Sequence, residues 1–291
     1  MTNNYFFFGF GQVAKYYVDE LIKRKKKFNF FVTTTSNSST KRFKGKAYRS
    51  FKFNGNKYDK KISDYLKSSN YLLISIPPSK GKDYVLSNFG KIIKSLNFKK
   101  IIYLSATSVY GNHNGKWVSE KSNLKPSTEF GKSRLKAEKR WLKISKKKNL
   151  NLVILRLSGI YSKESNPLMR LKAGPKTFIS KKNQFFSRIR VEDISRVLNK
   201  IFYDKKISRE IINISDDLPA SNENVTKFAA KLLDIKNLKS ISYKNLEGKM
   251  IKGFYKDSKK VSNKKMKSLL NIKLLYPDYK SGLRNLFRKS F

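Results

Sequence analysis

The sequence predicts an α/β fold in which helices cover both faces of a doubly wound parallel sheet. Five short apolar runs between residues 5 and 157 of the 291-residue chain are typical of buried strands. Segments with helical spacing lie between most of them, and a glycine pair joins the first run to the first helix. Strands that are apolar on both faces and alternate with helices indicate a parallel sheet with helices on both sides.

The expected strands are rich in aromatic and β-branched residues. They are Tyr5–Phe8, Phe28–Thr34, Tyr71–Ile76, Lys100–Ser105 and Leu152–Leu157. We expect helices directly after Gly11, over Val85–Leu96 and over Lys132–Ser145. A basic cluster at 24–27 stands where the first helix would end, and cations are favourable at a helix C-terminus.

This rhythm predicts a sheet domain over residues 1–157. Residues 158–291 are expected to form a smaller C-terminal α/β lobe over the substrate, with strands and helices partly interleaved with the first domain. A homodimer is also expected, through the helix at Lys132–Ser145.

The composition excludes several kinds of site. The chain has no Cys and a single His, His113, so disulfides, Cys-ligated zinc, thiol catalysis and a His-built metal centre are not expected. No apolar run reaches the roughly 18–20 residues that span a bilayer, and no basic segment precedes the first apolar run. We therefore expect a soluble cytoplasmic protein without a metal site.

The net charge of +46 has two interpretations. Of 66 basic residues, 53 are Lys and 13 are Arg, and the chain is also rich in Asn, Ile, Phe and Tyr, a bias that A+T-rich coding produces. Specific nucleic-acid sites usually favour Arg. Compositional bias is the favoured interpretation, and a polyanion-binding function is the alternative. Non-specific, salt-dependent adsorption to nucleic acid follows from either.

The glycine pair fits a phosphate-binding turn. Gly9-x-Gly11-x-x-Ala14 matches the dinucleotide fingerprint between a strand and a helix. The first glycine allows the tight turn, the second lets a pyrophosphate approach the backbone, and the small third residue allows close helix packing. A Rossmann-type domain is therefore expected, in which Gly9, Phe10, Gly11, Gln12 and Val13 contact the cofactor.

The end of the second strand favours NADP over NAD. NAD sites usually place an Asp or Glu there to bind the ribose hydroxyls. No carboxylate occurs between Glu20 and Asp59. The segment instead carries hydroxyls followed by two cations, so the expected contacts to a 2′-phosphate are Thr35, Ser36, Lys41 and Arg42.

The middle of the chain carries a family resemblance. Residues Ile101–Trp141 resemble the extended and atypical short-chain dehydrogenase/reductase superfamily, and within it the NAD-dependent epimerase/dehydratase-like, or YeeZ-like, proteins. Further stretches agree in order: Ile74–Pro78, Leu155–Tyr161, Ser187–Ile194, Ile212–Pro219, Val261–Met266 and Tyr276–Tyr279. The resemblance places Ile76, Pro77 and Ser105 among the cofactor contacts.

The same resemblance locates an altered active site. Enzymes of the superfamily use a Tyr as general acid or base, with a Lys four residues later, and a Ser or Thr that polarises the substrate oxygen. Here these positions hold Phe130, Arg134 and Ala106. The candidate catalytic residues are therefore Thr107, Tyr110 and Arg134, and Arg134 is also expected to bind the cofactor ribose.

Three functions remain open after this departure. The favoured one is an oxidoreductase or sugar-nucleotide-modifying enzyme with an atypical active site, whose substrate is a nucleotide-sugar or an aldehyde or ketone. A second is a non-catalytic NADP(H)-binding sensor or scaffold. A third is a basic nucleic-acid-associated protein on the same fold.

Overall fold

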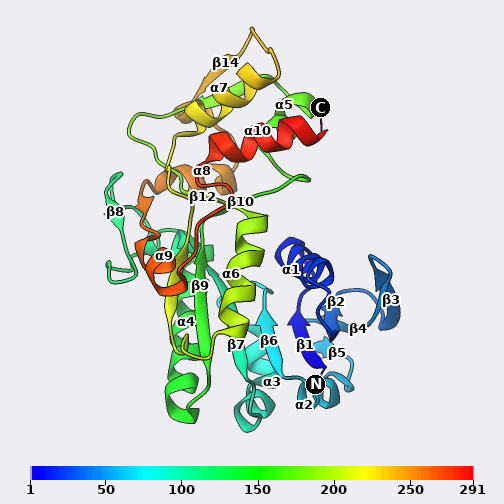
Figure 1. Cartoon of the computed structure of the whole chain (residues 1–291). Helices are drawn as coiled ribbons and strands as arrows, with labels where there is room; N and C mark the ends of the chain where they lie inside the picture. The colour runs from blue at the N-terminus through cyan, green and yellow to red at the C-terminus, as the bar shows by residue number, and fades with distance from the viewer. Residues whose placement is uncertain (1, 291) are drawn as a thin grey trace. The chain divides into compact units, whose positions relative to one another are not determined.

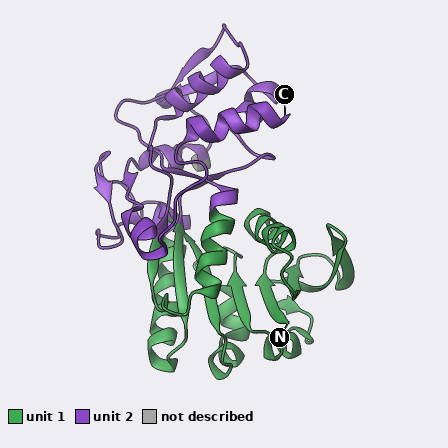
Figure 2. Cartoon of the chain, viewed as in Figure 1, with its two compact units in different colours: residues 1–106, 132–156, 194–212 green, residues 107–131, 157–193, 213–291 purple. Residues whose placement is uncertain are grey.

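All five apolar runs form strands in the computed structural model, which describes residues 2–290 (Figure 1). The chain builds two compact units (Figure 2). The first contains residues 1–106, 132–156 and 194–212, and the second contains residues 107–131, 157–193 and 213–291. Each unit is therefore assembled from segments that are distant in the sequence.

Strands and helices alternate along most of the first unit. Four of its elements, α4, β9, α6 and β13, have one end in the residue ranges of the second unit. In chain order the elements are β1 (Asn3–Phe8), α1 (Gln12–Lys23), β2 (Phe28–Thr34), β3 (Ser39–Phe43), β4 (Lys46–Asn54), β5 (Lys57–Tyr58), α2 (Ile62–Lys67), β6 (Tyr71–Ile74), α3 (Tyr84–Ser95), β7 (Lys100–Ala106), α4 (Glu129–Lys148), β9 (Leu152–Leu157), α6 (Val191–Tyr203) and β13 (Ile211–Ile214).

The strands of this unit form one sheet in the order β13-β9-β7-β6-β1-β2-β4-β3, and β5 pairs with β4. Strand β1 is parallel to both of its neighbours, with Tyr5 opposite Phe30 of β2 and Tyr71 of β6. The chain thus proceeds from β1 to one side of the sheet and returns to β6 on the other side. This confirms the expected doubly wound sheet and puts its topological switch point between β1 and β6.

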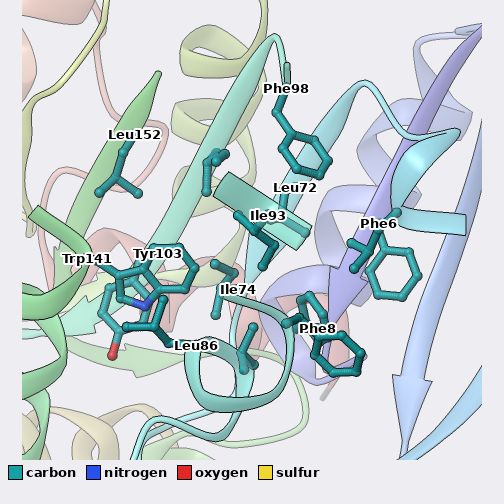
Figure 3. Packing of buried hydrophobic residues seen from close by; sticks show 14 of the residues in the cluster. Phe6, Phe8, Leu72, Ile74, Leu86, Ile93, Phe98, Tyr103, Trp141 and Leu152 are labelled. Atoms are coloured by element: carbon teal, nitrogen blue, oxygen red, sulfur yellow. The ribbon is translucent and has the colours of Figure 1, made fainter. Parts of the chain in front are cut away.

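Alternate residues of β1 point to opposite faces of the sheet and pack against different helices on each face. Phe6 and Phe8 belong to a buried cluster with residues of α2, α3 and α4 (Figure 3). The ring of Tyr5 faces the other way, with its centroid 5.9 Å from that of Tyr17 on α1 and 5.5 Å from that of Phe202 on α6. A strand that buries both faces needs apolar residues at every position, which explains the run of four aromatic residues.

A buried carboxylate joins two helices on the first of these faces. Asp83 is the N-cap of α3 and accepts a hydrogen bond from the Leu86 amide (3.0 Å). Its other oxygen accepts a hydrogen bond from Trp141 Nε1 of α4 (2.7 Å), and Trp141 lies in the core beside Tyr103 (Figure 3). Burial raises the pKa of the Asp83 carboxyl. One side chain thereby begins α3 and fixes α4 against it.

A hairpin stands between β2 and β6 where no strand was expected. Strands β3 and β4 are antiparallel, and β4 is parallel to β2. The turn between them consists of Lys44 (φ +48°) and Gly45 (φ +79°). Two successive positive φ angles give the twist that a two-residue hairpin prefers. This hairpin therefore extends the sheet beyond β2.

The second unit is made of short elements. Its strands pair in twos, β10 with β12, β11 with β14 and β15 with β8. Helices α5, α7 and α10 contribute most of one apolar core. The elements are the 3₁₀ turn Thr107–Tyr110, β8 (Trp117–Val118), β10 (Gly159–Tyr161), α5 (Pro167–Ala173), β11 (Thr177–Ser180), β12 (Arg188–Arg190), α7 (Asn222–Leu232), β14 (Lys239–Ser242), the 3₁₀ turn Tyr243–Asn245, α8 (Lys249–Lys256), β15 (Lys260–Val261), α9 (Lys264–Leu270) and α10 (Tyr279–Ser290). In the part of the chain that the structure describes, no helix is both long enough and apolar enough for a membrane crossing.

The second unit buries a carboxyl group that has no hydrogen-bond partner. Asp216 is 1% exposed, and neither of its side-chain oxygens finds a donor among the described residues. Burial raises the pKa of this carboxyl to about 8, because the Arg188 charge offsets only part of the desolvation. The titratable and charged groups that face it are Arg188, Asp217, Asp278, Tyr161 and Tyr279.

Asp216 should make the stability of the protein depend on pH. A folded pKa of about 8, against an ordinary value of 3.8, means that the folded state holds the proton more tightly than the unfolded state. Stability from this group is fully present below about pH 4 and is lost as the pH rises towards 8. Asp216→Asn removes the titration, so we expect it to be more stable than the wild type at pH 8.5 and to lose that advantage at pH 5.

Urea unfolding at the two pH values measures this difference. Asp64→Asn is the matched control, because Asp64 is exposed and its ion pair within the described residues is with the exposed Lys67. The interpretation of Asp216 is wrong if the difference in free energy of unfolding between Asp216→Asn and the wild type is the same at both pH values.

Candidate functional site

The turn after β1 has no room for a side chain at its first glycine. Gly9 has a φ of +91°, and a Cβ at this position would lie 2.7 Å from Ser75 Oγ and 3.1 Å from Ile76 Cγ1. The Gly9 amide donates a hydrogen bond to Thr33 Oγ1 (2.8 Å). The turn is therefore held between the residues that end β2 and those that follow β6, and only glycine satisfies it.

The second glycine, in contrast, has open space where a side chain would begin. Gly11 has an ordinary φ of −79°, it is exposed, and no described atom lies within 4 Å of the position of a Cβ. It is the N-cap of α1 and provides no side-chain cap, and the first turn of α1 contains no acidic residue. The amides of a first helical turn have no partner within the helix, and the helix dipole favours an anion there. The fold itself does not require glycine at this position, whereas a bound phosphate would.

A surface pocket of about 960 Å³ opens beside this turn, at the carboxyl ends of β1, β2 and β6. Its charged lining residues are three lysines, Lys15, Lys41 and Lys57. None of the described residues that line it is Asp or Glu. The lining residues are Gly9, Phe10, Lys15, Val32, Thr33, Thr34, Thr35, Lys41, Tyr48, Ser50, Phe53, Asn54, Gly55, Asn56, Lys57, Ile76, Pro77, Ser79 and Tyr84.

The β3–β4 hairpin places Lys41 and Arg42, the two basic residues predicted to bind a 2′-phosphate, on opposite faces of a strand. Lys41 and Arg42 are neighbours on β3, and neighbouring side chains of a strand point to opposite faces. Lys41 lines the pocket, opposite Tyr48 of β4. Arg42 does not line it and donates to the carbonyl oxygen of Gly45 (3.0 Å). Only Lys41 of this pair is placed to contact a ligand in the pocket.

Some of the other predicted cofactor contacts line the pocket and some do not. The pocket brings together Gly9, Phe10, Thr35, Lys41, Ile76 and Pro77. Gly11, Gln12 and Val13 lie at the beginning of α1, where Val13 is buried and Gln12 is partly exposed. Ser36 lies outside the lining, and its hydroxyl is 3.0 Å from Thr34 Oγ1.

Sequence reasoning missed the residues that the hairpin and the loops contribute. These are Lys15, Tyr48, Ser79, Tyr84 and the segment 54–57. Lys15 could have been found, because it lies one helical turn after Gly11. The others lack a motif. Tyr48 and the segment 54–57 reach the pocket because β4 and β5 extend the sheet, whereas Ser79 follows β6 and Tyr84 begins α3.

Two further predicted residues bond within the first unit. Ser105 is buried and donates to Glu138 Oε1 of α4 (2.5 Å), while Glu138 Oε2 accepts from Arg156 Nη2 of β9 (2.7 Å). Arg134 donates from Nη1 to the carbonyl oxygen of Leu104 (2.9 Å). Burial lowers the pKa of Arg134, although a guanidinium remains charged in a protein. These bonds fix the end of β7 to α4.

The residues at the expected catalytic positions differ in the exposure and the hydrogen bonding of their side chains. Phe130 begins the Tyr-x-x-x-Lys segment on α4, one turn before Arg134, and its ring is 65% exposed. In the second unit, Tyr110 is fully buried and its hydroxyl donates to Asn213 Oδ1 (2.7 Å). Thr107 begins the same 3₁₀ turn and is partly exposed. The geometry therefore favours Thr107 over Tyr110 as a group that could contact a substrate.

Comparisons with known proteins bear on the family and the fold of this chain. Residues 88–214 match the model of the NAD dependent epimerase/dehydratase family. The solved structure of a functionally unknown conserved protein from Silicibacter pomeroyi DSS is 29% identical, with a TM-score of 0.86 over 99% of both chains. UDP-N-acetylglucosamine 4-epimerase from Bacillus cereus is 16% identical, with a TM-score of 0.77 over 99% of both chains. A search of curated proteins finds no match.

A ligand-bound structure also has this fold. UDP-glucuronic acid 4-epimerase from Bacillus cereus, in complex with UDP-glucuronic acid and NAD, is 18% identical and has a TM-score of 0.79. The match covers 99% of this chain and all of that one, 100%. The extended short-chain dehydrogenase/reductase fold expected from the sequence is confirmed over the whole length of the chain.

The two glycines should respond differently to substitution. Gly9→Ala forces a side chain into the left-handed region and against Ser75, so we expect a loss of at least about 1–2 kcal/mol in the free energy of unfolding. Gly11→Val meets no described atom, so its stability should change by less than about 1 kcal/mol while dinucleotide affinity falls at least about tenfold.

Chemical denaturation and calorimetric titration measure the two effects separately, and Gly11→Ala gives the smallest added side chain for comparison. A Gly11→Val protein that folds and binds the dinucleotide as the wild type does would contradict the phosphate-binding role of this turn.

Proposed function

Because the chain has the fold of the extended short-chain dehydrogenase/reductase superfamily and carries an NAD-dependent epimerase/dehydratase domain over residues 88–214, we propose that its first unit binds a nicotinamide dinucleotide. The observation that carries this proposal is Gly11, a glycine that the fold does not need, at the N-terminus of a helix beside a large pocket. The pyrophosphate would approach the amides at the start of α1. The adenosine would lie towards Ile76 and the β3–β4 hairpin.

NADP is the proposed form of the cofactor. The lining residues at the end of β2 are Thr33, Thr34 and Thr35, which offer hydroxyls but no carboxylate for a ribose diol. The next carboxylate in the sequence is Asp59, which accepts a hydrogen bond from Ser38 (2.6 Å). The lysines in the pocket suit the extra charge of a 2′-phosphate. When bound, the nicotinamide would supply a hydride donor or acceptor.

The reaction we propose belongs to the oxidoreductases or to the enzymes that modify sugar-nucleotides. The substrate class follows from similar proteins, which include epimerases that act on UDP-sugars, and an aldehyde or ketone is the alternative. With Phe130 in place of the tyrosine, the proton-transfer group must be another one, and Thr107 is the candidate that the geometry favours, while Arg134 is a candidate only for orienting the substrate or the cofactor. Arg134 can orient a ribose or an oxyanion but cannot serve as an acid at neutral pH.

A non-catalytic NADP(H)-binding protein is the second candidate. The observation that favours it is Phe130 itself, an exposed ring without a hydroxyl at the position where the superfamily places its acid. A thermal-shift comparison of NAD, NADH, NADP and NADPH tests cofactor binding under either candidate. Turnover with UDP-sugars or aldehydes then separates the two.

Lys41 should determine the preference for NADPH. Its ammonium would pair with the 2′-phosphate, so Lys41→Gln should weaken NADPH about tenfold, or ~1.4 kcal/mol, and leave NADH unchanged. Arg42→Gln is the matched control, because Arg42 is the next residue and bonds to Gly45 outside the pocket. Calorimetric titration of both cofactors gives the four affinities. Equal losses in the two variants, or a wild type that prefers NADH, would remove Lys41 from the site.

Restoring the missing hydroxyl should separate the enzyme from the binding protein. Phe130→Tyr places a phenol one helical turn before Arg134, and since the side chain is exposed the fold should not change. If the chain is an oxidoreductase with an impaired acid, NADPH-dependent turnover should rise about tenfold or more, within the range that a positioned acid provides. Phe130→Leu is the control. No gain in a folded, NADPH-binding variant would support the non-catalytic function.

A further inference from the structure

A second pocket lies in the second unit, along its last helix. It has a volume of about 310 Å³ and is lined by Leu275, Tyr276, Ser281, Arg284, Asn285 and Arg288. Arg284 and Arg288 are four residues apart on α10, so their side chains lie on one face of the helix. Both are exposed. None of these residues also lines the pocket of the first unit.

Most of the arginines of this chain are engaged by the protein, and the exposed Arg140 of α4, which lines neither pocket, is an exception. Nine of the 13 donate to a protein oxygen, namely Arg24, Arg42, Arg49, Arg134, Arg156, Arg170, Arg188, Arg190 and Arg209. Among the described residues, Arg284 and Arg288 have no such acceptor, and Arg284 only stacks over the ring of Phe228 (5.4 Å). Two guanidinium groups without protein acceptors therefore border one pocket.

Hydrogen bonds and ring contacts hold two of the residues that line this pocket, Leu275 and Tyr276, in place. The buried Asp193 accepts hydrogen bonds from the amides of Leu275 (2.7 Å) and Tyr276 (3.0 Å). The Arg190 guanidinium lies 4.6 Å from the centre of the Tyr276 ring, and the Tyr276 hydroxyl donates to Asn285 Oδ1 (3.0 Å). The pocket is thus formed by fixed groups and does not depend on an unconstrained loop.

The carboxylates close to this pocket already have partners. Glu192 binds Arg190 through both oxygens (2.6 and 2.8 Å). Asp278 accepts from the Ser281 amide (2.7 Å) at the beginning of α10. Neither is a lining residue. The charge of the lining is therefore positive, and among residues 2–290 an anion would meet two guanidinium groups without displacing a carboxylate.

We propose that this pocket binds a small molecule through its phosphate group, at a site that is additional to the dinucleotide pocket. Guanidinium groups bind phosphate oxygens with two parallel hydrogen bonds, which an ammonium cannot do. The chain carries most of its positive charge as Lys, so a pair of unengaged Arg on one helix face is the feature that distinguishes this surface. Ser281 and Asn285 add polar groups, and the ring of Tyr276 offers a flat side for a sugar or a base.

The test is calorimetric titration of the full chain, at 150 mM salt, with inorganic phosphate, glucose 1-phosphate and AMP as separate probes. The double variant Arg284→Gln/Arg288→Gln should raise the Kd of the best probe at least tenfold. Arg284→Lys/Arg288→Lys keeps the charge and should raise it severalfold, because the two-bond geometry is lost. The order of the three probes distinguishes a free phosphate from a sugar phosphate or a nucleotide.

The matched control is Lys139→Gln/Arg140→Gln, which removes the same charge from two exposed residues of α4. It should leave the Kd within twofold of the wild type. NADPH affinity should be unchanged in the α10 variants, so a failure of this proposal is distinguishable from a failure of the dinucleotide proposal. Equal losses in the control pair, or no binding of any probe at 10 mM, would overturn the α10 site.

Discussion

The lack of space at residue 9 is the constraint on which the rest of the first unit depends. Strand β1 occupies the middle of the sheet, and a hydroxyl from each side lies near its end, that of Thr33 in the last residues of β2 and that of Ser75 directly after β6. Ser75 donates to the carbonyl oxygen of Phe8 (2.9 Å), so both hydroxyls bond to the backbone where β1 ends. This closeness fixes the direction in which the chain leaves β1. The beginning of α1 is thereby aimed at the carboxyl ends of the strands, where a pocket can form.

The few acidic residues of this chain carry much of its architecture. Only 20 residues are Asp or Glu, and several of these are buried in structural roles. Glu138 joins β7, α4 and β9, Asp83 joins α3 to α4, and Asp193 fixes the loop before α10. A carboxylate that accepts two or three hydrogen bonds inside the protein cannot also neutralise a surface lysine. The excess of positive charge is therefore left outside the cores, where even non-specific anions would be attracted.

The sequence predicted the strands and helices that have a clear apolar pattern. It did not predict the features that depend on three-dimensional geometry and have no sequence motif. The run Tyr5–Phe8 has to be a central strand, because both of its faces are apolar. The sequence of β3 is typical of an exposed polar segment. The turn after it consists of Lys44 and Gly45, whereas the usual sequence signal for a hairpin turn is Asn-Gly or Asp-Gly. The different positions of Lys41 and Arg42 follow from that strand, so they could not be foreseen. The pocket on α10 has no sequence signal, because Arg284 and Arg288 differ from the many other exposed basic residues only in sharing a pocket, which the sequence does not show.

The residues that hold the architecture of the first unit are different from the residue at the proposed tyrosine position. The bonds of Ser105, Glu138 and Arg156 hold α4 against the sheet, and Arg134 adds a bond to the end of β7. None of them involves residue 130. A ring that is 65% exposed contributes little burial, so exchanging a tyrosine for a phenylalanine there changes the stability of the fold by little. The residue at position 130 can therefore change without any change in the pocket beside Gly9, whose lining includes residues of β2 and the hairpin and residues that follow β1 and β6. Selection for binding alone would be enough to preserve everything that the first unit displays.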